Sequence, residues 1–334
     1  MRALVLSGYG GPECTALAEV PQPVPRANEL LVRVHAAGLN PVDYKTRTGA
    51  LKVIHKYPLP IVMGNELSGV VEAAGQAVTR FAKGDRVFAR VDKKIMGAFA
   101  DYAVVPEDHA ARMPASLDFP SAAAVPLAGL TALQALRDEL RLSASDRIFI
   151  PGGAGGVGTF AIQIAKHLGA YVATTASPRG EALVKRLGAD VVIDYQSERF
   201  EEKLSGYDCA FDLVGGDTLA RLWPVLKRGG HVVSIAGMPE PMTARKDLEA
   251  GSGLAALFWI ASLATRWRAA RRGVSYRYLF MHPSGADLAY LASFIEARKL
   301  EIVIDRVFPF AETKEAIAYL ETGRAKGKVV LAMD

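Results

Sequence analysis

A strand, a glycine-rich turn and a helix follow one another within residues 147–177, and this succession limits the fold more than any other part of the chain. The apolar run 148–150 is typical of a buried parallel strand. Gly153, Gly155 and Gly158 fit the spacing G-x-G-x-x-G, in which glycines permit a tight turn, backbone approach to a pyrophosphate and close helix packing. These features predict a dinucleotide site on a parallel sheet. The residues expected to hold the pyrophosphate are Gly153, Ala154, Gly155, Gly156, Val157 and Gly158.

The next part of this stretch indicates which dinucleotide binds. A helix over 160–168 is expected to end at Gly169, and a second strand to follow it. Sites for NAD place an acid about 20 residues after the glycines to bind the ribose 2′-hydroxyl, but residues 174–180 contain none. Ser177 and Arg179 instead offer a hydroxyl and a guanidinium to a 2′-phosphate. The sequence therefore predicts NADPH, and an ordinary solvated arginine in a loop is the simpler alternative for Arg179.

Composition places the chain among soluble globular enzymes with two domains, because 50% of its 334 residues are hydrophobic and 22% are charged. The 40 lysines and arginines against 35 acidic residues give a net charge of +5 without a basic tail, so no nucleic-acid partner is expected. Cys14 and Cys209 suit free thiols in a reducing compartment. The first residues lack the layout of a signal peptide, and a cytoplasmic location is expected.

Strand signals dominate the first part of the chain and alternate with helix signals after it. Short runs cut by glycine and proline predict a partly open antiparallel β-barrel over residues 1–124. The β–α alternation that follows predicts a doubly wound α/β domain over 125–282, and the chain then returns to the first domain over 283–334. The expected strands of the barrel are 3–6, 30–37, 68–74, 86–89 and 99–105.

An apolar and basic insert interrupts the second domain near residues 245–273. Residues 254–264 carry no charge, and four arginines follow within 266–272. The uncharged run is too short to span a bilayer, which needs about 20 residues. Two readings remain: a buried helix at a subunit or substrate interface, or an amphipathic helix resting on a membrane. Trp267 and the alanines would pack well at an interface, so the sequence favours the first reading and no membrane partner is expected.

Motifs along nearly the whole chain carry a specific family resemblance. They occupy residues 38–43, 60–71, 83–87, 126–132, the glycine turn and 327–330. In this order they resemble the medium-chain dehydrogenase/reductase superfamily, and within it the zinc-independent quinone oxidoreductases (the zeta-crystallin-like group) and the related 2-alkenal, enone and furanone reductases. The resemblance implies an α/β protein with a GroES-like, partly open β-barrel catalytic domain and a Rossmann NADP-binding domain, assembled as a homodimer.

Asparagines stand where zinc relatives carry metal ligands. Zinc alcohol dehydrogenases of this superfamily have a cysteine at the place of Asn40 and a histidine at the place of Asn65, and neither amide replaces a thiolate or an imidazole well. The cysteine-rich lobe for a structural zinc is also missing, because Cys14 and Cys209 are the only thiols. No metal is therefore expected. Without a Lewis acid the acceptor should be an activated one, such as a quinone, an enal or an enone.

The implied reaction is hydride transfer from NADPH to a quinone or an electron-poor C=C bond, with the nicotinamide between the two domains. For an enal or enone, hydride at the β-carbon leaves an enolate, which needs a hydrogen-bond donor and then a proton. Asn40 is the candidate donor, Lys45 the candidate cation, and Tyr44 or Tyr57 the candidate proton donor. In the alternative account, Asn40 and Asp43 brace the loop, the others are surface residues, and solvent supplies the proton.

The resemblance to alkenal reductases also implies cofactor contacts. Lys45 matches a lysine near the cofactor phosphate or substrate, and Thr131 matches a threonine on the nicotinamide side. That group grips the 2′-phosphate with a serine, a nearby lysine and a tyrosine; this chain keeps Ser177 and Tyr195, but Gly180 stands at the lysine place, next to the arginine described above. The residues implied to line the nicotinamide end are Ile235, Gly237, Leu279, Phe280, Met281 and Lys328, with strand-end packing as the alternative.

Two other functions stay open beside an oxidoreductase for small apolar electrophiles. Reduction of trans-2-enoyl thioesters uses similar chemistry, but mitochondrial-type enoyl thioester reductases have a tyrosine near the place of Leu51. A non-catalytic NADPH-binding interaction protein would use the insert as its contact surface. Hydrolysis has no support, because no G-x-S-x-G nucleophile motif is present.

Overall fold

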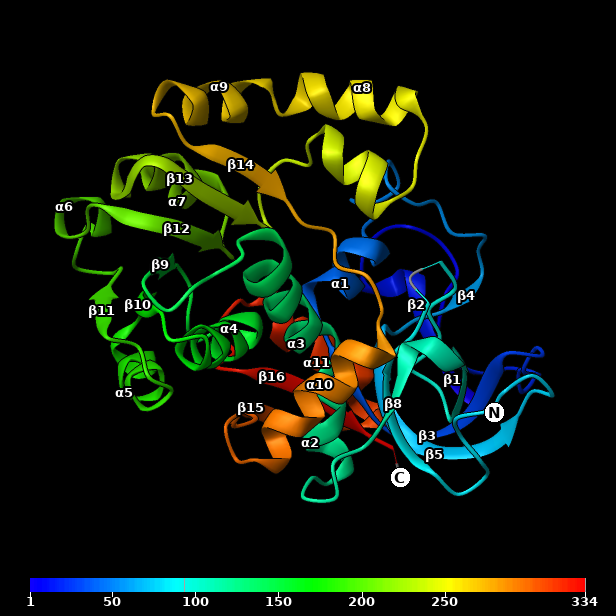
Figure 1. The fold of residues 1–334 in the computed structure, drawn as a ribbon. Coiled ribbons are helices and arrows are strands. Elements are labelled where there is room, and N and C mark those ends of the chain that lie inside the picture. Colours follow the sequence, from blue (N-terminus) through cyan, green and yellow to red (C-terminus); the bar gives the residue numbers. More distant parts are fainter. Residues whose placement is uncertain (93, 334) are drawn as a thin grey trace. The chain divides into compact units, whose positions relative to one another are not determined.

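A computed structural model describes residues 1–92 and 94–333 of the protein (Figure 1). The chain divides into two compact units: a first unit of Met1–Leu130 with Pro283–Asp334, and a second unit of Thr131–His282. The boundary expected from the sequence, 124/125, lies between α2 (Phe119–Ala123) and α3 (Pro126–Leu133).

The second unit is built on a six-stranded parallel sheet with the order β11-β10-β9-β12-β13-β14. Counted along the chain this order is 3-2-1-4-5-6, the doubly wound arrangement of dinucleotide-binding sheets, so the predicted fold class is confirmed. Ile148, Phe149 and Ile150 of the central strand are fully buried, as expected for a parallel strand covered on both faces. The strands are β9 (Arg147–Ile150), β10 (Tyr171–Ala176), β11 (Val191–Asp194), β12 (Tyr207–Asp212), β13 (Leu226–Ser234) and β14 (Ser275–Tyr278).

Helices connect these strands. α4 begins at the glycine turn and ends before Gly169, whose φ of +86° is the left-handed conformation of a helix-terminating glycine. Two π-helical turns, at Gln134–Glu139 and Thr243–Asp247, lie before the sheet and within the insert. The helices of the second unit are α4 (Gly156–His167), α5 (Pro178–Arg186), α6 (Phe200–Lys203), α7 (Gly216–Leu222), α8 (Ser252–Ala261) and α9 (Leu263–Arg271).

The first unit holds a mixed seven-stranded sheet and a smaller three-stranded sheet. Its central strand β3 pairs with β16, β5 and β7, and it is buried along most of its length because its sequence is almost continuously apolar. β15 and β16 complete the sheet, which ties the C-terminal segment to this unit. The strands are β1 (Arg2–Leu6), β2 (Thr15–Glu19), β3 (Glu29–Leu39), β4 (Ile61–Val62), β5 (Glu66–Ala74), β6 (Arg86–Arg90), β7 (Tyr102–Pro106), β8 (Ala110–Arg112), β15 (Ile304–Pro309) and β16 (Lys328–Ala332), and the further helices are α1 (Pro41–Arg47), α10 (Gly285–Glu296) and α11 (Thr313–Glu321).

The insert expected as one helix forms two helices, α8 and α9, which run end to end beside β14 (Figure 1). The break falls at Ser262, whose hydroxyl donates to Phe258 O at 2.7 Å. Such bonds to the carbonyl four residues back bend helices, which explains the interruption. Among the described residues, neither these helices nor any other has the length and apolar character needed to cross a membrane.

Candidate active site

The glycine turn after β9 has the geometry that a pyrophosphate needs. Gly152 has a φ of +82°, a conformation that favours glycine. A Cβ at Gly153 would lie 2.1 Å from Thr174 Oγ1, and one at Gly158 would lie 2.5 Å from Gly152 O. At Gly155 the nearest atom to such a Cβ is 3.4 Å away. The turn is therefore tightly packed on its inner side, and space remains at the N-terminus of α4, where backbone N–H groups can bind a phosphate.

Two threonines of β10 hold this turn in place. Thr175 Oγ1 accepts a hydrogen bond from Gly152 N at 2.9 Å, and Thr174 Oγ1 donates to Ile150 O at 2.6 Å. Both threonines are buried, so these bonds are not exchanged with water. In the sequence, this role is indicated only by a pair of hydroxyl residues inside an otherwise apolar strand.

The carboxyl ends of β10 and β11 bring the predicted 2′-phosphate residues together. Ala176 pairs with Asp194, so the residues that follow them, Ser177 and Tyr195, leave the sheet side by side. Ser177 is buried, whereas Arg179 and Tyr195 are exposed. The Asp194 carboxylate accepts hydrogen bonds from the turn that follows β11. A hydroxyl, a phenol and a guanidinium thus share one sheet edge, and this combination suits a phosphate better than a ribose hydroxyl.

A buried serine and aspartate join the carboxyl ends of β12 and β13. Ser234 Oγ donates to Asp212 Oδ2 at 2.6 Å, and both residues are fully buried. Ile235 N donates to Asp212 O at 3.1 Å, and Gly237 N donates to Ser234 Oγ at 2.8 Å. A Cβ at Gly237 would lie 2.5 Å from Tyr276 Oη. This junction therefore holds the predicted residues Ile235 and Gly237 in one backbone arrangement.

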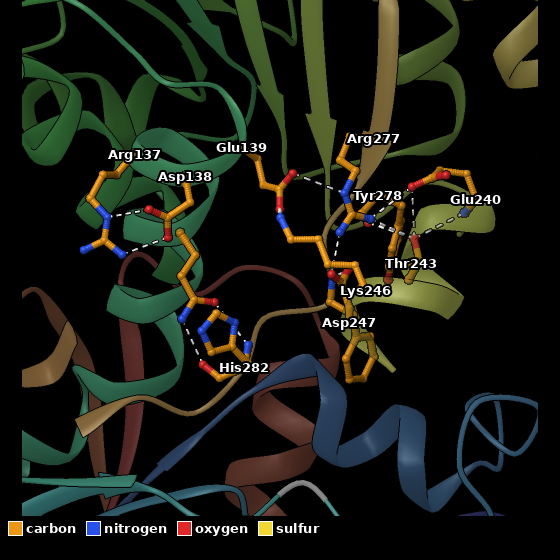
Figure 2. Close-up of polar contacts among 12 residues, drawn as sticks. Arg137, Asp138, Glu139, Glu240, Thr243, Lys246, Asp247, Arg277, Tyr278 and His282 are labelled. Atoms are coloured by element: carbon orange, nitrogen blue, oxygen red, sulfur yellow. Dashed lines mark hydrogen bonds and ion pairs between the residues drawn. The ribbon is translucent and has the colours of Figure 1, made fainter. Parts of the chain in front are cut away.

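A half-buried ion cluster positions the segment that follows β14 (Figure 2). Arg277 Nε lies 3.2 Å from Glu139 Oε2 and Nη1 lies 3.0 Å from Glu240 Oε1, while Nη2 pairs with Asp247. The other oxygen of Asp247 accepts the Phe280 N–H at 2.9 Å, and burial raises the pKa of Asp247. Phe280 lies in the middle of the stretch expected to line the nicotinamide. The cluster therefore determines where this stretch runs.

Gln134 holds the end of the same segment through both ends of its amide. Its Nε2 donates to His282 O at 2.9 Å, and its Oε1 accepts the His282 N–H at 3.1 Å. The two residues are 148 positions apart, so no local pattern in the sequence connects them. Thr131, the predicted nicotinamide-side residue, is buried in α3 shortly before Gln134.

In the first unit, Lys328 is the centre of a second buried cluster. Its Nζ donates to Glu66 Oε1 and to Asn40 Oδ1, both at 2.6 Å, and to Leu39 O at 3.0 Å. Asn40 Nδ2 donates to the same Glu66 oxygen at 2.6 Å. Lys328, Glu66 and Asn40 are each at most 3% exposed. A Cβ at Gly38 would lie 2.3 Å from Glu66 Oε1, so the glycine makes room for the carboxylate.

Asp43 extends this cluster to the N-terminus of α1. Its Oδ2 accepts the Asn40 N–H at 2.7 Å, and its Oδ1 accepts from Asn65 Nδ2 at 2.6 Å. Burial and, to a smaller extent, the nearby Glu66 carboxylate raise the pKa of Asp43 to about 6, although its hydrogen bonds from Asn65 and Asn40 and the Lys328 ammonium lower it. The Asp43 carboxyl therefore keeps its proton to a higher pH than an ordinary aspartate does.

The three remaining catalytic candidates lie on or near α1. Lys45 is exposed, and Tyr44 is half-buried, which raises the pKa of its phenol. Tyr57 is 8% exposed, its N–H donates to Tyr9 Oη at 2.8 Å, and burial raises its pKa to about 12. Both Tyr44 and Tyr57 therefore keep their protons at neutral pH. Tyr57 is not the surface residue that the simpler account assumed.

The amides at the position of the zinc ligands do not suit a metal. Asn40 uses both ends of its amide on Glu66 and Lys328, and Asn65 donates to Asp43. The Glu66 carboxylate is paired with the Lys328 ammonium at 2.6 Å. Within residues 1–92 and 94–333, no group of three or more His, Cys, Asp or Glu side chains could hold a metal ion.

Most of the predicted cofactor residues share one edge of the parallel sheet. The strands all run the same way, so their carboxyl ends lie together, and ligands of such sheets bind outside these ends. The glycine turn, Ser177, Tyr195 and the segments after β13 and β14 all lie there. Lys45 and Lys328 belong to the first unit, where the Lys328 ammonium is bonded to Glu66 and Asn40. Glu66 was not among the residues predicted from the sequence, although an acidic residue at the start of an otherwise apolar strand indicates a buried polar contact.

Two protein families match the chain. Residues 26–115 match the family described as "Alcohol dehydrogenase GroES-like domain", and residues 187–331 match the family described as "Zinc-binding dehydrogenase". The first match covers most of the strands of the first unit, and the second covers much of the parallel sheet and the return segment.

Individual proteins are similar over nearly the whole chain. "NADPH-dependent alkenal/one oxidoreductase, chloroplastic" of Arabidopsis thaliana is 36% identical, over 99% of this chain and 79% of its own length. The quinone oxidoreductase of Coxiella burnetii is 33% identical with a TM-score of 0.87, over 100% of this chain and 99% of that one. The Escherichia coli quinone oxidoreductase, solved in complex with NADPH, is 26% identical with a TM-score of 0.83, over 99% and 100% of the two chains.

Proposed function

Because this chain belongs to the quinone oxidoreductase and alkenal reductase group of the medium-chain dehydrogenases and reductases, we propose that it is an NADPH-dependent reductase of quinones or α,β-unsaturated carbonyls. The observation that carries this conclusion is the carboxyl edge of the parallel sheet, where a glycine turn with room for a pyrophosphate lies beside Ser177, Arg179 and Tyr195.

The choice of NADPH over NADH rests on this edge. The turn places backbone N–H groups at the start of α4, and Ser177, Tyr195 and Arg179 would hold the 2′-phosphate. The proposed nicotinamide-side residues, Ile235, Gly237 and the segment 279–281, are held by buried serine, aspartate and arginine contacts. When bound, NADPH supplies the hydride. The protein supplies a pre-formed backbone that fixes its position.

The roles of the first unit's residues follow from their contacts. Both ends of the Asn40 amide are hydrogen-bonded to Glu66 and Lys328. This supports a role in bracing the loop over a role as hydrogen-bond donor to the substrate. Lys45 is exposed and free to approach a phosphate or a carbonyl oxygen. Tyr44 and Tyr57 keep their protons at neutral pH, so either phenol can donate to an enolate oxygen. We assign proton donation to this pair, with solvent as the alternative source.

We further propose that the reaction needs no zinc. The bonded amides of Asn40 and Asn65 and the ammonium of Lys328 support this, because none of them is a metal ligand of the kind zinc requires. A homodimer formed through β14 is also proposed, since β14 is an outer strand of the sheet and a second copy could extend it. The free thiols of Cys14 and Cys209 are consistent with a cytoplasmic location.

The direct test is cofactor oxidation by the purified, chelator-treated full chain. NADPH and NADH are each supplied with quinones, short enals, cyclic enones and enoyl thioesters, and their absorbance is followed. We expect turnover with NADPH and a quinone or enone, unchanged by the chelator. Turnover only with long enoyl thioesters would favour the thioester reductase. Tight NADPH binding without turnover on any acceptor would instead indicate a non-catalytic binding protein.

A further inference from the structure

The helix pair α8–α9 is apolar on the side that faces the protein. Ala255, Phe258, Ser262 and Ala269 are buried and recur at spacings of three, four and seven residues, which defines the inner side of the pair. A surface helix with such an inner side normally carries polar residues on the opposite side. This pair does not.

The opposite side carries bulky apolar residues. Ile260, Leu263 and Trp267 recur at spacings of three and four residues and are 66%, 49% and 57% exposed. Leu257 and Trp259 beside them are about half exposed. We call these five residues the outer face. Single exposed apolar residues are normal, but a contiguous group on one element marks a contact surface.

Arginines border the outer face without acidic residues between them. Residues 250–272, which include both helices, contain four arginines and no aspartate or glutamate. The Arg271 guanidinium lies 4.7 Å from the centre of the Trp267 ring, and Arg266 lies 6.0 Å from that of Trp259. The aromatic rings of the outer face and the positive charges therefore lie next to one another.

A groove of about 890 Å³ continues the outer face, and Trp267 belongs to both. Six arginines line it, and Glu201 is the acid among its lining residues. Glu201 pairs with Arg199 at 2.9 Å and with Arg221 at 3.2 Å. Among the residues that the structure describes, no ion pair is formed by the other four arginines of the groove, which are Arg228, Arg268, Arg271 and Arg272.

We propose that the outer face and the groove bind the surface of a bilayer that contains anionic lipids. The apolar side chains would insert at the boundary of headgroups and acyl chains, and the arginines would contact lipid phosphates. Tryptophan, aliphatic residues and arginine on one helix surface are the composition of membrane-surface helices. The proposal holds whichever acceptor the enzyme reduces.

The charges favour a bilayer over the alternatives. A twofold contact through the outer face itself, as distinct from the β14 edge, would bring the uncompensated arginines of two chains together, at a cost in repulsion. An acidic protein would pair with the arginines but leaves Ile260 and Leu263 unexplained. The sequence alone favoured a subunit or substrate interface for this segment; the exposed outer face and the unpaired groove arginines reverse that preference.

Flotation of the full chain with vesicles tests the electrostatic contribution of the arginines to membrane binding. Phosphatidylcholine vesicles are compared with vesicles of phosphatidylcholine and phosphatidylglycerol, and we expect binding to the second kind. The double variant Arg268→Gln, Arg271→Gln should bind about 30-fold more weakly, from roughly fivefold per arginine. Lys299→Gln with Lys314→Gln removes the same charge from exposed positions of the first unit and should bind as the wild type does.

A second variant tests the apolar part. Ile260→Ser with Leu263→Ser keeps every charge, so this variant should still bind anionic vesicles at low salt. It should lose the vesicle binding that the wild type keeps at high salt, because that part depends on apolar insertion. In the wild type, vesicle binding should shift the tryptophan emission to shorter wavelength, because Trp259 and Trp267 are exposed while Trp223 is buried. Circular dichroism of both variants should match the wild type, since the substituted side chains point outward.

Three results would overturn the proposal. The first is equal vesicle binding by the wild type and the double arginine variant, or no binding to anionic vesicles at low salt. The second is a concentration-dependent dimer that the Ile260→Ser, Leu263→Ser variant loses, without any vesicle binding, which would assign the outer face to a second copy. The third is capture by polyglutamate in the absence of vesicle binding, which would assign the groove to an acidic protein.

Discussion

Removal of the Lys328 ammonium tests the buried cluster of the first unit. Lys328→Met keeps most of the aliphatic chain but leaves Glu66, which is fully buried, and Asn40 without their partner at 2.6 Å. Taking one member from a buried ion pair costs about 3–5 kcal/mol, because the other charge stays buried without compensation. Whole proteins unfold with about 5–15 kcal/mol, so the variant should lose a large share of its stability.

The assay must report on the first unit. The three tryptophans, Trp223, Trp259 and Trp267, all lie in the second unit, so their fluorescence is a poor probe. Urea unfolding followed by circular dichroism gives the overall free energy, and hydrogen exchange of the amides of β3 and β16 gives the local one.

A matched control separates burial from charge. Lys83→Met breaks an ion pair with Glu72 at 2.5 Å in which both side chains are exposed, and it should cost at most about 1 kcal/mol. Adding Glu66→Gln to Lys328→Met removes the uncompensated charge and should restore most of the loss. The reasoning fails if Lys328→Met costs no more than Lys83→Met, or if Glu66→Gln restores nothing.

Three further predictions concern the clusters and the cofactor edge. The pKa of Asp43 is raised from 3.8 to about 6 in the folded protein, so the folded state binds a proton there more tightly than the unfolded state does. The free energy of unfolding should therefore fall by about 3 kcal/mol as the pH rises from about 4 to about 6. Asp43→Asn should abolish this part of the dependence of stability on pH. Gly158→Ala places a Cβ against a backbone carbonyl and should weaken NADPH binding in calorimetry by roughly tenfold or more, whereas Gly253→Ala, with open space around its Cβ, should leave it unchanged. Ser177→Ala with Arg179→Ala should raise the KM for NADPH by roughly a hundredfold, from two charge-assisted contacts, and hardly change that for NADH; equal effects on both cofactors would remove the basis for 2′-phosphate recognition.

Local patterns in the sequence predicted the dinucleotide sheet well. The glycine spacing, the apolar strand, the terminating Gly169 and the lack of an acid in residues 174–180 all lie within a short stretch. Each has a local effect: a glycine permits a positive φ angle or leaves space for close packing, and the lack of a carboxylate removes a partner for the ribose hydroxyl. The structure therefore preserves them as the sequence shows them.

The sequence could not predict which charged residues far apart in the chain would pair. Glu66 and Lys328 are 262 positions apart, and Arg277 meets Glu139 from 138 positions away. A buried charge is compensated by whichever group packing brings near it, and neither β-strand register nor helix ends can be read from the charges themselves. The sequence could place Asn40 in a loop but could not show that Lys328 and Glu66 would occupy its amide.

The sequence by itself determined the doubly wound sheet, its glycine turn and its preference for NADPH, because these depend on residues close together in the chain. Only the tertiary structure decided the partners of the buried carboxylates and which side of α8–α9 stays exposed. Burial and charge compensation are properties of the packed molecule, since they depend on which distant segments meet.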